Sequence, residues 1–511
     1  MKKIILLCIL ISAAVGGFTE TLSLQDTVRL VLKNDETLQI AAESVESAYQ
    51  GYRITRSQGY PQLTLQTDPL YGVGMRRDYN FNDFPPVART TVSNSFSIGL
   101  GLSQLLPTGG VLNTSIDDTF QYNIQLAEED LDQSTALTQQ PEFTINYQQP
   151  LFVNGKLIDG KLLKAGNDAA ELGWRSSQES QLSTKNSVLL RAAQLYLQLI
   201  SIDKNTAFLQ ERLVIAKEQL EQSVIDREQG RASENQVLGL EVAVNRQREA
   251  LLDTDLARIQ TENQLRKMIQ LGDFSNYTLD PEIEHIITSA DDFISKIAGG
   301  NIYQKALADN PDITAKRFEG QTKRLQARVN DSEKAANMSM FFTISPRYPD
   351  DREDADSFAA SFSDFFTDDS GVNLNFGLAF EIPLTDGGAR KAQRAADKSG
   401  IRLAELNIAA AENDVAEKIQ IAQKRNEILR KRMELLQVDI EYQQNRLERE
   451  EQLANLKTTT QLKVDSIRLD LLSTENQLWQ TGADLLLNLL EMASLAGEPL
   501  EKVLVTAKSA E

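Results

Sequence analysis

Apolar and polar residues alternate strictly in three segments of the chain. The clearest lies between Val372 and Ile382, where every second residue is apolar, and the same alternation occurs at 96–103 and 143–148. This period of two predicts β-strands with one apolar and one polar face. Each segment approaches the ~9–11 residues that a tilted strand needs to cross a bilayer. A soluble sandwich with one buried face would show the same alternation, so the pattern alone leaves both structures open.

Two segments rich in helix-forming residues are much longer than the helices of ordinary domains. They span residues 156–229 and 389–455 and contain neither proline nor a long polar break. At 1.5 Å per residue, about 70 residues form a rod of roughly 105 Å. Each rod is expected to turn back and return through a second helix of about 35 residues. Apolar residues at helical spacing, such as Leu189, Ala193 and Tyr196, predict that these helices pack on one another.

The same order of elements occurs twice. In each half a helical segment, 24–56 or 302–336, leads into strands, and the strands lead into a long helical hairpin. Ser23 and Asn301 are placed to cap the first helix of their half, and both helical segments carry an asparagine, Asn34 or Asn310, that can cap a restarted helix. These matches predict an internal repeat.

The repeat divides the chain into nine segments. They are a signal segment (1–17), the short helices (18–61), strands (62–155) and long hairpin (156–271) of the first copy, a connector (272–300), the short helices (301–339), strands (340–386) and long hairpin (387–496) of the second copy, and a C-terminal tail (497–511). The two hairpins account for most of the length, so a chain of 511 residues need not fold into several compact domains.

The N-terminus has the pattern of a cleaved secretory signal. Two lysines precede an apolar run at 4–15, which ends in Gly16-Gly17. The run is too short for the ~20 residues of a membrane-spanning helix. The only cysteine, Cys8, lies inside this run among bulky residues, where lipid attachment is not expected. The formal charge of −20 argues against a nucleic-acid partner, because binding phosphates requires clustered Lys and Arg.

For an exported chain with so few strands, the alternation favours a membrane β-barrel over a soluble sandwich. The longest polar segment between strands, 349–371, is rich in aspartate with interleaved phenylalanine, and barrels of this kind keep their long loops outside the cell. One chain supplies too few strands to close a useful pore. Several protomers must therefore share one barrel.

These segments, in this order and in two copies, resemble the TolC family of outer-membrane efflux proteins across essentially the whole mature chain. The segments that carry the resemblance are 32–35 with 308–311, 60–63, 149–152 with 382–388, and the turn 230–238. The resemblance implies a mixed α/β membrane protein, a homotrimer with one shared transmembrane β-barrel and a long periplasmic α-helical barrel. It also implies a passive channel in outer-membrane lipid that docks to a periplasmic adaptor, or membrane fusion protein, and to an inner-membrane efflux pump or ABC exporter.

By the same resemblance, the tips of the two hairpins contact the adaptor. The tip residues are Gly230, Arg231, Ala232 and Ser233 in the first hairpin and Lys457, Thr458, Thr459 and Thr460 in the second. The second tip departs from the family because Leu456-Lys457 stands where a glycine is usual. Asp465 is the candidate for an acidic residue that narrows the periplasmic entrance, although a solvated acid on a helix face would look the same. Strand-to-helix junctions are expected at Pro150, Gly155, Pro383, Gly387 and Gly388.

The first half contains an additional predicted hairpin, with arms at 96–105 and 111–120 joined by a Pro- and Gly-containing turn. If both arms cross the bilayer, each protomer contributes about six strands where the family usually has four, and a trimer about eighteen where it usually has twelve. If the hairpin lies at the rim of the barrel, the usual number applies. We favour the first alternative.

No enzyme is expected. The only histidine, His285, lies in the connector, where a surface or packing role is the ordinary one. Residues 385–391 lack the glycine and Lys-Ser/Thr spacing of a phosphate-binding loop. Neither a cofactor nor a metal site is predicted. The alternative to a channel is a periplasmic coiled-coil scaffold with small soluble sheets, which would be extracted without detergent and would not conduct.

Overall fold

The computed structural model describes residues 20–80, 87–127, 134–153, 156–157, 161–270, 277–298, 301–333, 337–347, 371–381, 385–456 and 458–505. The predicted signal segment with Cys8 and the acidic segment at 349–370 lie outside this part of the chain. The structure divides into two compact units. The first comprises Met1–Glu46, Ser176–Arg317 and Leu406–Glu511, and the second comprises Ser47–Arg175 and Phe318–Glu405.

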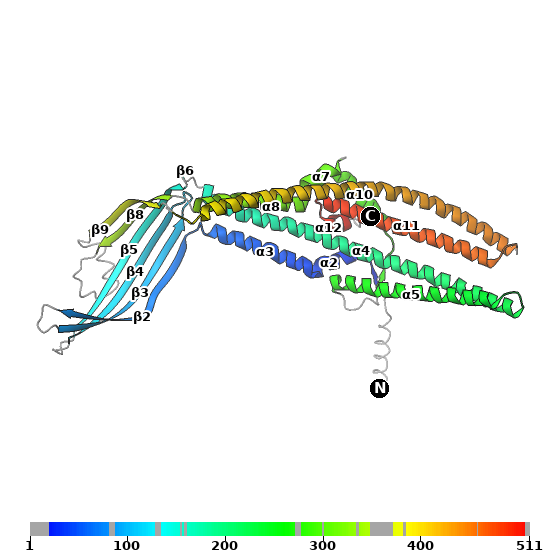
Figure 1. The fold of residues 1–511 in the computed structure, drawn as a ribbon, viewed down its shortest axis with the longest axis horizontal. Coiled ribbons are helices and arrows are strands. Elements are labelled where there is room, and N and C mark those ends of the chain that lie inside the picture. Colours follow the sequence, from blue (N-terminus) through cyan, green and yellow to red (C-terminus); the bar gives the residue numbers. More distant parts are fainter. Residues whose placement is uncertain are drawn as a thin grey trace, which may run out of the picture. The chain divides into compact units, whose positions relative to one another are not determined.

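The two halves of the chain have the same order of helices (Figure 1). The first half contains α2 (Leu24–Asn34), α3 (Glu36–Ser57), α4 (Lys161–Glu228) and α5 (Glu234–Ile269), and the second contains α7 (Ile302–Asp309), α8 (Pro311–Glu333), α10 (Ala389–Asn455) and α11 (Gln461–Leu495). The connector forms α6 (Glu284–Ala298), and α12 (Leu500–Val505) follows α11. The long helices of 68 and 67 residues are followed by helices of 36 and 35 residues, so each half contains one long helical hairpin.

One boundary differs from the sequence-based expectation. The first long helix begins at Lys161 rather than at residue 156. Lys156 and Leu157 instead form the short strand β6 (Lys156–Leu157), which pairs with Val153 and Phe152. The ladder of the sheet therefore continues past the position where helix propensity alone predicted a helix.

The second unit contains a single antiparallel sheet. Its strands are β2 (Gln62–Asn80), β3 (Val87–Leu105), β4 (Val111–Ala127), β5 (Ser134–Val153), β8 (Asn337–Arg347) and β9 (Gly371–Glu381). They lie side by side in the order β2-β3-β4-β5-β8-β9, and β6 pairs with β5 off this path. Both arms of the additional hairpin, β3 and β4, are paired along their length inside the sheet. The sheet of one chain therefore has six long strands, with β2 and β9 at its edges.

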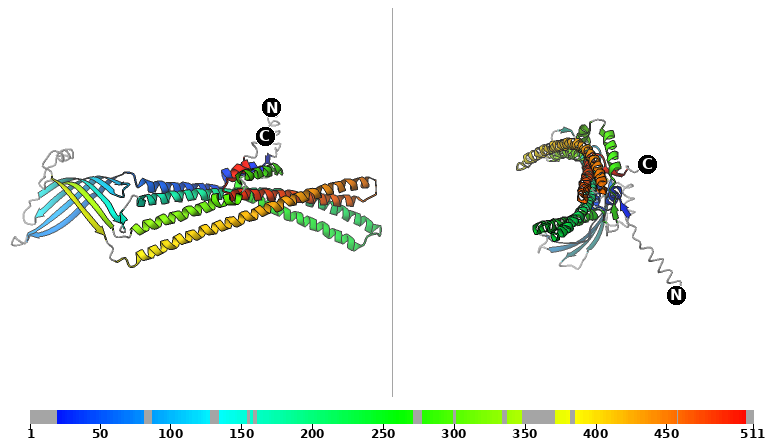
Figure 2. Two further views of the ribbon diagram at one scale, coloured as in Figure 1. Left: turned by 90° about the horizontal axis from the view of Figure 1, so that it is seen from above. Right: turned by 90° about the vertical axis from the view of Figure 1, so that its right-hand side faces the viewer.

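The first unit contains a layer of four helices in the order α5-α4-α11-α10 (Figure 2). Arg258 on α5 pairs with Asp203 on α4 at 2.8 Å. Gln480 on α11 donates a hydrogen bond to Ser201 on α4 at 3.2 Å, and Asn488 on α11 donates to the carbonyl oxygen of residue 422 on α10 at 2.9 Å. The predicted stripe on α4 is buried in the core of this unit, which also includes side chains of α2, α6, α11 and α12.

Two three-residue strands also belong to the first unit. β1 (Glu20–Leu22) and β7 (Tyr277–Leu279) pair in parallel. The hydroxyl of the fully buried Tyr196 on α4 lies 2.9 Å from the carbonyl oxygens of both Leu22 and Asp280, and it accepts a hydrogen bond from the Asp280 amide at 3.1 Å. Burial raises the pKa of this hydroxyl above its usual value, so it stays protonated and able to donate. Tyr196 thus joins the small sheet to the long helix.

Equivalent asparagines connect the short and long helices in both halves. Asn34 donates a side-chain hydrogen bond to the carbonyl oxygen of Ile269 at 2.8 Å, and Asn310 donates to that of Leu495 at 3.1 Å. Ile269 and Leu495 are the last residues of α5 and α11, where carbonyl groups lack helical partners. Asn310 also caps α8, but in the first half Asp35, rather than Asn34, accepts the amide bonds at the start of α3.

Candidate functional site: a two-faced sheet, two hairpin tips and the outer helices

The register of the sheet places one row across all six strands that is apolar at every position except Thr114 on β4. Each residue of this row is the Cα partner of the next, and the row consists of Leu63, Leu102, Thr114, Ile145, Ile344 and Leu374. The flanking residues on the same face are also apolar, since Leu65, Leu100 and Ile116 continue it on β2 to β4 and Phe342, Phe376 and Leu378 on β8 and β9. Most of these side chains are exposed within the single chain. Among the described residues, one face of the sheet is therefore mainly apolar and exposed.

The neighbouring row points to the opposite face and is polar on every strand. It consists of Gln62, Ser103, Asn113, Asn146, Thr343 and Asn375. Successive residues of a strand point to opposite faces, so the two rows define the two surfaces of one layer. The aromatic residue Phe341 lies on the polar face above Gly377, where a Cβ would stand only 2.4 Å from the phenyl ring. Gly377 thus makes room for a ring that would otherwise project from this face.

The first hairpin tip has a conformation that its sequence determines. Gly230 has a φ of 73°, and the amides of Gly230 and Arg231 donate to the carbonyl oxygens of Arg227 and Asp226 at 2.9 and 2.7 Å. This is the Schellman arrangement that ends a helix at a glycine. Ser233 then caps α5 in a capping box with Gln236. The exposed tip, Gly230 to Ser233, is held by hydrogen bonds at both helix ends.

The second tip is built without a glycine. Lys457 lies outside the described residues, and Thr458 donates from its amide and its hydroxyl to the carbonyl oxygen of Leu453 at 3.0 and 2.8 Å. Thr460 stands at the N-cap of α11 but makes no side-chain cap bond. Thr459 is half-buried and Thr460 is exposed. At this tip an amide and a hydroxyl group donate to the same carbonyl oxygen, whereas at the first tip two backbone amides donate to that of Asp226.

Ion pairs between the two arms brace the second tip. Lys463 on α11 pairs with Glu450 on α10 at 3.0 Å, and Arg468 pairs with Glu451 at 3.0 Å. The hydrogen bond from Lys463 lowers the pKa of Glu450 below its usual value. These four residues were not among the predicted site residues, although acidic residues precede the turn and basic residues follow it in the sequence.

Asp465, the gate candidate, is only 7% exposed in the single chain. Its carboxylate accepts a hydrogen bond from the Gln461 side chain at 2.9 Å, one turn earlier in α11. The side chain is therefore not a freely solvated acid on a helix face, which was the ordinary alternative. It lies close to the braced second tip, at the start of the returning helix.

Two glycines with a left-handed backbone lie at the junction between β9 and α10. Gly387 and Gly388 have φ values of 60° and 86°. The Asp386 carboxylate accepts the amides of Gly388 and Arg390 at 3.0 and 2.8 Å, and these bonds lower the pKa of Asp386. In the first half, Pro150 lies at a register irregularity between β5 and β8. Gly155 and Pro383 lie outside the described residues.

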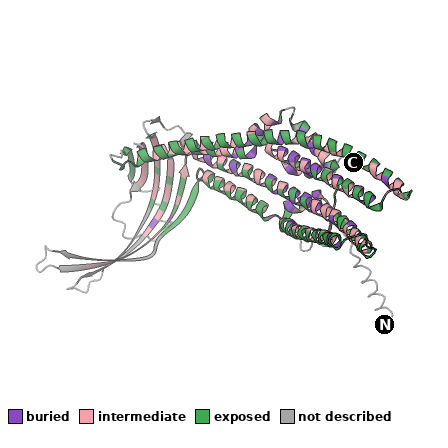
Figure 3. Ribbon diagram, turned by 45° about the vertical axis from the view of Figure 1, so that its right-hand side comes forward, coloured by how far each residue is buried: buried purple, intermediate pink, exposed green. Residues whose placement is uncertain are grey.

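The two outer helices of the helical layer carry exposed apolar residues at coiled-coil spacing. On α10 they recur every seventh residue, at Ile421, Ile428, Leu435 and Tyr442, and on α5 they are Leu238, Val242, Leu252, Leu256 and Ile259. Leu435 is 71% exposed, and much of the surface of α10 is open to solvent (Figure 3). A repeat of seven is typical of a seam against another helix. These two helices have such seams but no described neighbour that covers them.

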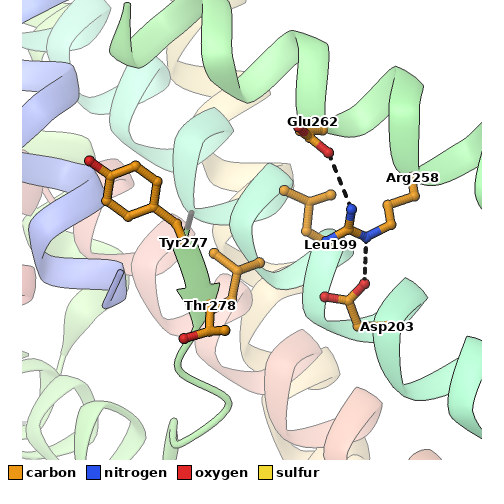
Figure 4. Close-up of a pocket in the computed structure, with 7 residues that line it drawn as sticks. Leu199, Asp203, Arg258, Glu262, Tyr277 and Thr278 are labelled. Carbon is orange, nitrogen blue, oxygen red and sulfur yellow. Dashed lines mark hydrogen bonds and ion pairs between the residues drawn. The ribbon is translucent and has the colours of Figure 1, made fainter. Parts of the chain in front are cut away.

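A cavity of about 250 Å³ lies between α4, α5 and β7 and is lined by Leu199, Asp203, Arg258, Glu262, Tyr277, Thr278 and Leu279. Figure 4 shows the Arg258 guanidinium between two carboxylates. It pairs with Asp203 at 2.8 Å and with Glu262 at 3.3 Å, and the hydrogen bond with Asp203 raises its pKa. Both carboxylates that line the cavity are thus paired with Arg258, the one basic residue in its lining. We assign the cavity no ligand.

Other chemistry is sparse among the described residues. His285 is exposed on α6. In the part of the chain that the structure covers, His, Cys, Asp and Glu form no group of three or more that could hold a metal ion. None of the described helices combines the length and apolar character that a membrane crossing requires.

The described chain thus combines a two-faced sheet of antiparallel strands with two long helical hairpins. No protein-family model matches the chain, and no curated protein matches its sequence. Solved structures do match. The structure of CusC is 15% identical and covers 94% of this chain and 93% of its own, with a TM-score of 0.57. The outer membrane protein VceC of Vibrio cholerae (13% identity, 93% and 96% coverage, TM-score 0.58) and the outer membrane channel CmeC of Campylobacter jejuni (14%, 93% and 85%, 0.58) are similar.

The chain therefore has the fold of these outer-membrane channel proteins over nearly its whole length. The resemblance to the TolC family is thus confirmed for the fold of the single chain, a mixed structure of β-strands and long helices.

Proposed function

We propose that this protein is a passive channel of the outer membrane, with a large periplasmic part. One observation carries the proposal: a row that is apolar on five of the six strands runs beside a row that is polar on all six. A layer with this arrangement can face lipid on one side and water on the other. The long helical hairpins would then form a tunnel below the barrel. No described group supplies energy, so transport would depend on a partner.

The channel is a homotrimer in this proposal. The sheet of one chain is open at β2 and β9, and a sheet in lipid must have no open edge. The exposed seams on α5 and α10 lie on the outer helices of the layer, where a neighbouring copy would cover them. Burying Leu435 in such a seam would contribute about 1.5–3 kcal/mol. Three copies would match the resemblance to the TolC family.

The hairpin tips are the proposed docking points for a periplasmic adaptor, which would connect the channel to an inner-membrane efflux pump or ABC exporter. The first tip supports this role because it is exposed and already fixed by the Schellman and capping-box bonds. A preformed tip loses little conformational entropy on binding. We further propose that the periplasmic entrance narrows near Asp465, where a ring of carboxylates from three copies would bind cations.

Extraction and conductance test the channel. Membranes of expressing cells are washed with salt and carbonate, and the protein extracted with detergent is reconstituted into planar bilayers. We expect extraction by detergent only and discrete conductance steps. Release by the washes, without conductance, would instead support the periplasmic scaffold. Asp465→Asn should raise the conductance and weaken block by divalent cations.

The trimer has its own test. Leu435→Glu places a charge in the seam of α10, whereas Gln437→Glu places the same charge at an exposed position outside the seam. Native mass spectrometry in detergent should show trimers for the Gln437 variant and fewer trimers for the Leu435 variant. Equal trimer populations in both variants would show that α10 does not form an interface between copies.

A further inference from the structure

We infer that the barrel is built from six strands of each copy, eighteen in a trimer, with β3 and β4 as full members of its wall. This inference rests on the proposed function, because it assumes that the sheet faces lipid. It goes beyond the family resemblance, which implies twelve strands. The evidence is the placement of β3 and β4 within the sheet of one chain.

The position of β3 and β4 in the sheet supports this inference. β3 and β4 lie between β2 and β5, so β2 has no direct contact with β5 through the ladder. β2 pairs with β3 from Gln62↔Ser103 onward, and β4 pairs with β5 from Val111↔Gln148 onward. These pairs are at the same end of the strands as the pairs between β5 and β8. A hairpin at the rim would leave β2 and β5 paired below it, and the ladder contains no such pairing.

The side chains on the two faces of β3 and β4 also support it. β3 contributes Leu102 to the apolar face, β4 contributes Leu112 and Ile116 on either side of Thr114, and Ser103 and Asn113 belong to the polar row. The hairpin is therefore two-faced at the same level as β9, where the corresponding residues are Leu374 and Asn375. Ser103 and Asn113 are also hydrogen-bonded to each other through their side chains at 2.7 Å. Strands that lie outside the membrane contact water on both faces, so an apolar face in register with the other strands would not be expected on them.

The directions of the two edge strands allow three copies to close one barrel. Each neighbouring pair on the main path is antiparallel, so β2 and β9 run in opposite directions. The β9 edge of one copy can therefore form an antiparallel ladder with the β2 edge of the next. Diameter grows roughly linearly with strand number, so eighteen strands give a barrel about 1.5 times as wide as twelve. A barrel of this size leaves an aqueous channel, and selection by size then falls to the helical part of the channel.

Paired cysteine variants in the intact membrane protein test this inference. The only native cysteine lies in the predicted signal, so each introduced thiol would be the only one in the mature chain. Leu102→Cys and Ser103→Cys are neighbours on β3, Leu112→Cys and Asn113→Cys are neighbours on β4, and Leu374→Cys and Asn375→Cys are the reference pair on β9. Each variant is labelled in outer membranes with a charged, water-soluble maleimide, and the rates are compared within each pair.

We expect the polar-face cysteine to react at least tenfold faster than its apolar-face neighbour on all three strands. Equal rates on β3 and β4, with the difference kept on β9, would place the hairpin outside the wall and overturn the inference while the channel proposal stands. Equal rates on β9 as well would overturn the channel proposal itself. The two failures are therefore distinguishable.

The edges have a second test. Leu63→Cys on β2 is combined in turn with Leu374→Cys, Phe376→Cys or Leu378→Cys on β9, which allows for the unknown register between copies. Five strand spacings of ~4.8 Å separate these positions within one chain, far beyond disulfide reach. Oxidation should yield covalent dimers and trimers for at least one combination. The combination of Thr114→Cys with the same β9 positions should yield none, and crosslinks through Thr114 alone would mean that β4 is the edge of the barrel sheet.

Discussion

The turn of the first hairpin should depend on the left-handed backbone of a single glycine. Gly230 has a φ of 73°. No heavy atom lies within 4 Å of a Cβ built on it. Replacing Gly230 by Ala therefore adds no clash, and its cost comes from the backbone conformation alone. For an L-residue this cost is about 1–2 kcal/mol.

A second glycine provides a matched control. Gly239 in α5 is equally free of neighbours, with no heavy atom within 4 Å of its Cβ position, but its backbone is helical. Gly239→Ala should stabilise the helix by roughly 0.5–1 kcal/mol, because alanine loses less backbone entropy than glycine. The same chemical change, nine residues apart in the sequence, should thus have opposite signs.

Hydrogen exchange measures this difference at the tip. The Arg231 amide donates to the Asp226 carbonyl oxygen at 2.7 Å, so it exchanges when the turn opens. A loss of 1–2 kcal/mol corresponds to opening that is roughly 5–30 times more frequent. Peptides that cover 226–236 should exchange faster by this factor in Gly230→Ala and no faster in Gly239→Ala. Unchanged exchange in Gly230→Ala, or the same acceleration in both variants, would refute the account of the turn.

Three further outcomes follow from buried or braced groups. Tyr196→Phe should lower the free energy of unfolding of the first unit by about 1–3 kcal/mol, measured by denaturant titration in detergent, because a buried carbonyl group loses its donor. Because pairing with Lys463 lowers the pKa of Glu450, the pair stabilises the second tip fully above the usual pKa of a glutamate, and this stabilisation is lost as the pH falls through the lower folded-state pKa. Amide hydrogen exchange at this tip, corrected for the intrinsic effect of pH, should therefore become faster in acid. Glu450→Gln should remove that pH dependence. Gly377→Ala should lower the thermal stability of the sheet, and Phe341→Leu should restore part of it, since the added methyl group meets the phenyl ring.

Local chemistry made much of the fold predictable from the sequence. The strict alternation predicted three strands of the sheet, β3, β5 and β9, and the capping positions Ser23 and Asn301 accept the amide bonds expected of them. The first tip was predictable because glycine and serine are required at fixed positions of a Schellman motif followed by a cap. These signals depend only on residues a few positions apart.

Features that depend on distant residues could not be predicted. The strands β1 and β7 have three residues each and exist because they pair across more than 250 residues of sequence. Asp35 caps α3, and the side chain of Asn34 is instead hydrogen-bonded to the carbonyl oxygen of Ile269. The brace between Glu450 and Lys463 requires the packing of α10 on α11. Each case involves a partner that no local pattern identifies.

The two halves of the chain differ in strand number, and physical reasons allow the difference. The first half contributes four strands to the main path of the sheet and the second contributes two. Inserting one strand would reverse the direction of every following strand. The two edge strands of the sheet would then run in the same direction, so neighbouring copies would meet through a parallel pair. Inserting a hairpin adds two strands, so the direction of β5 relative to β2 is preserved and its apolar face stays on the same side. The sheet can therefore widen by pairs of strands, while the number of long helices in each copy remains four. In the proposed channel, the width of the barrel can therefore change without a change in the width of the tunnel, because the β3–β4 hairpin adds two strands to the sheet and no long helix.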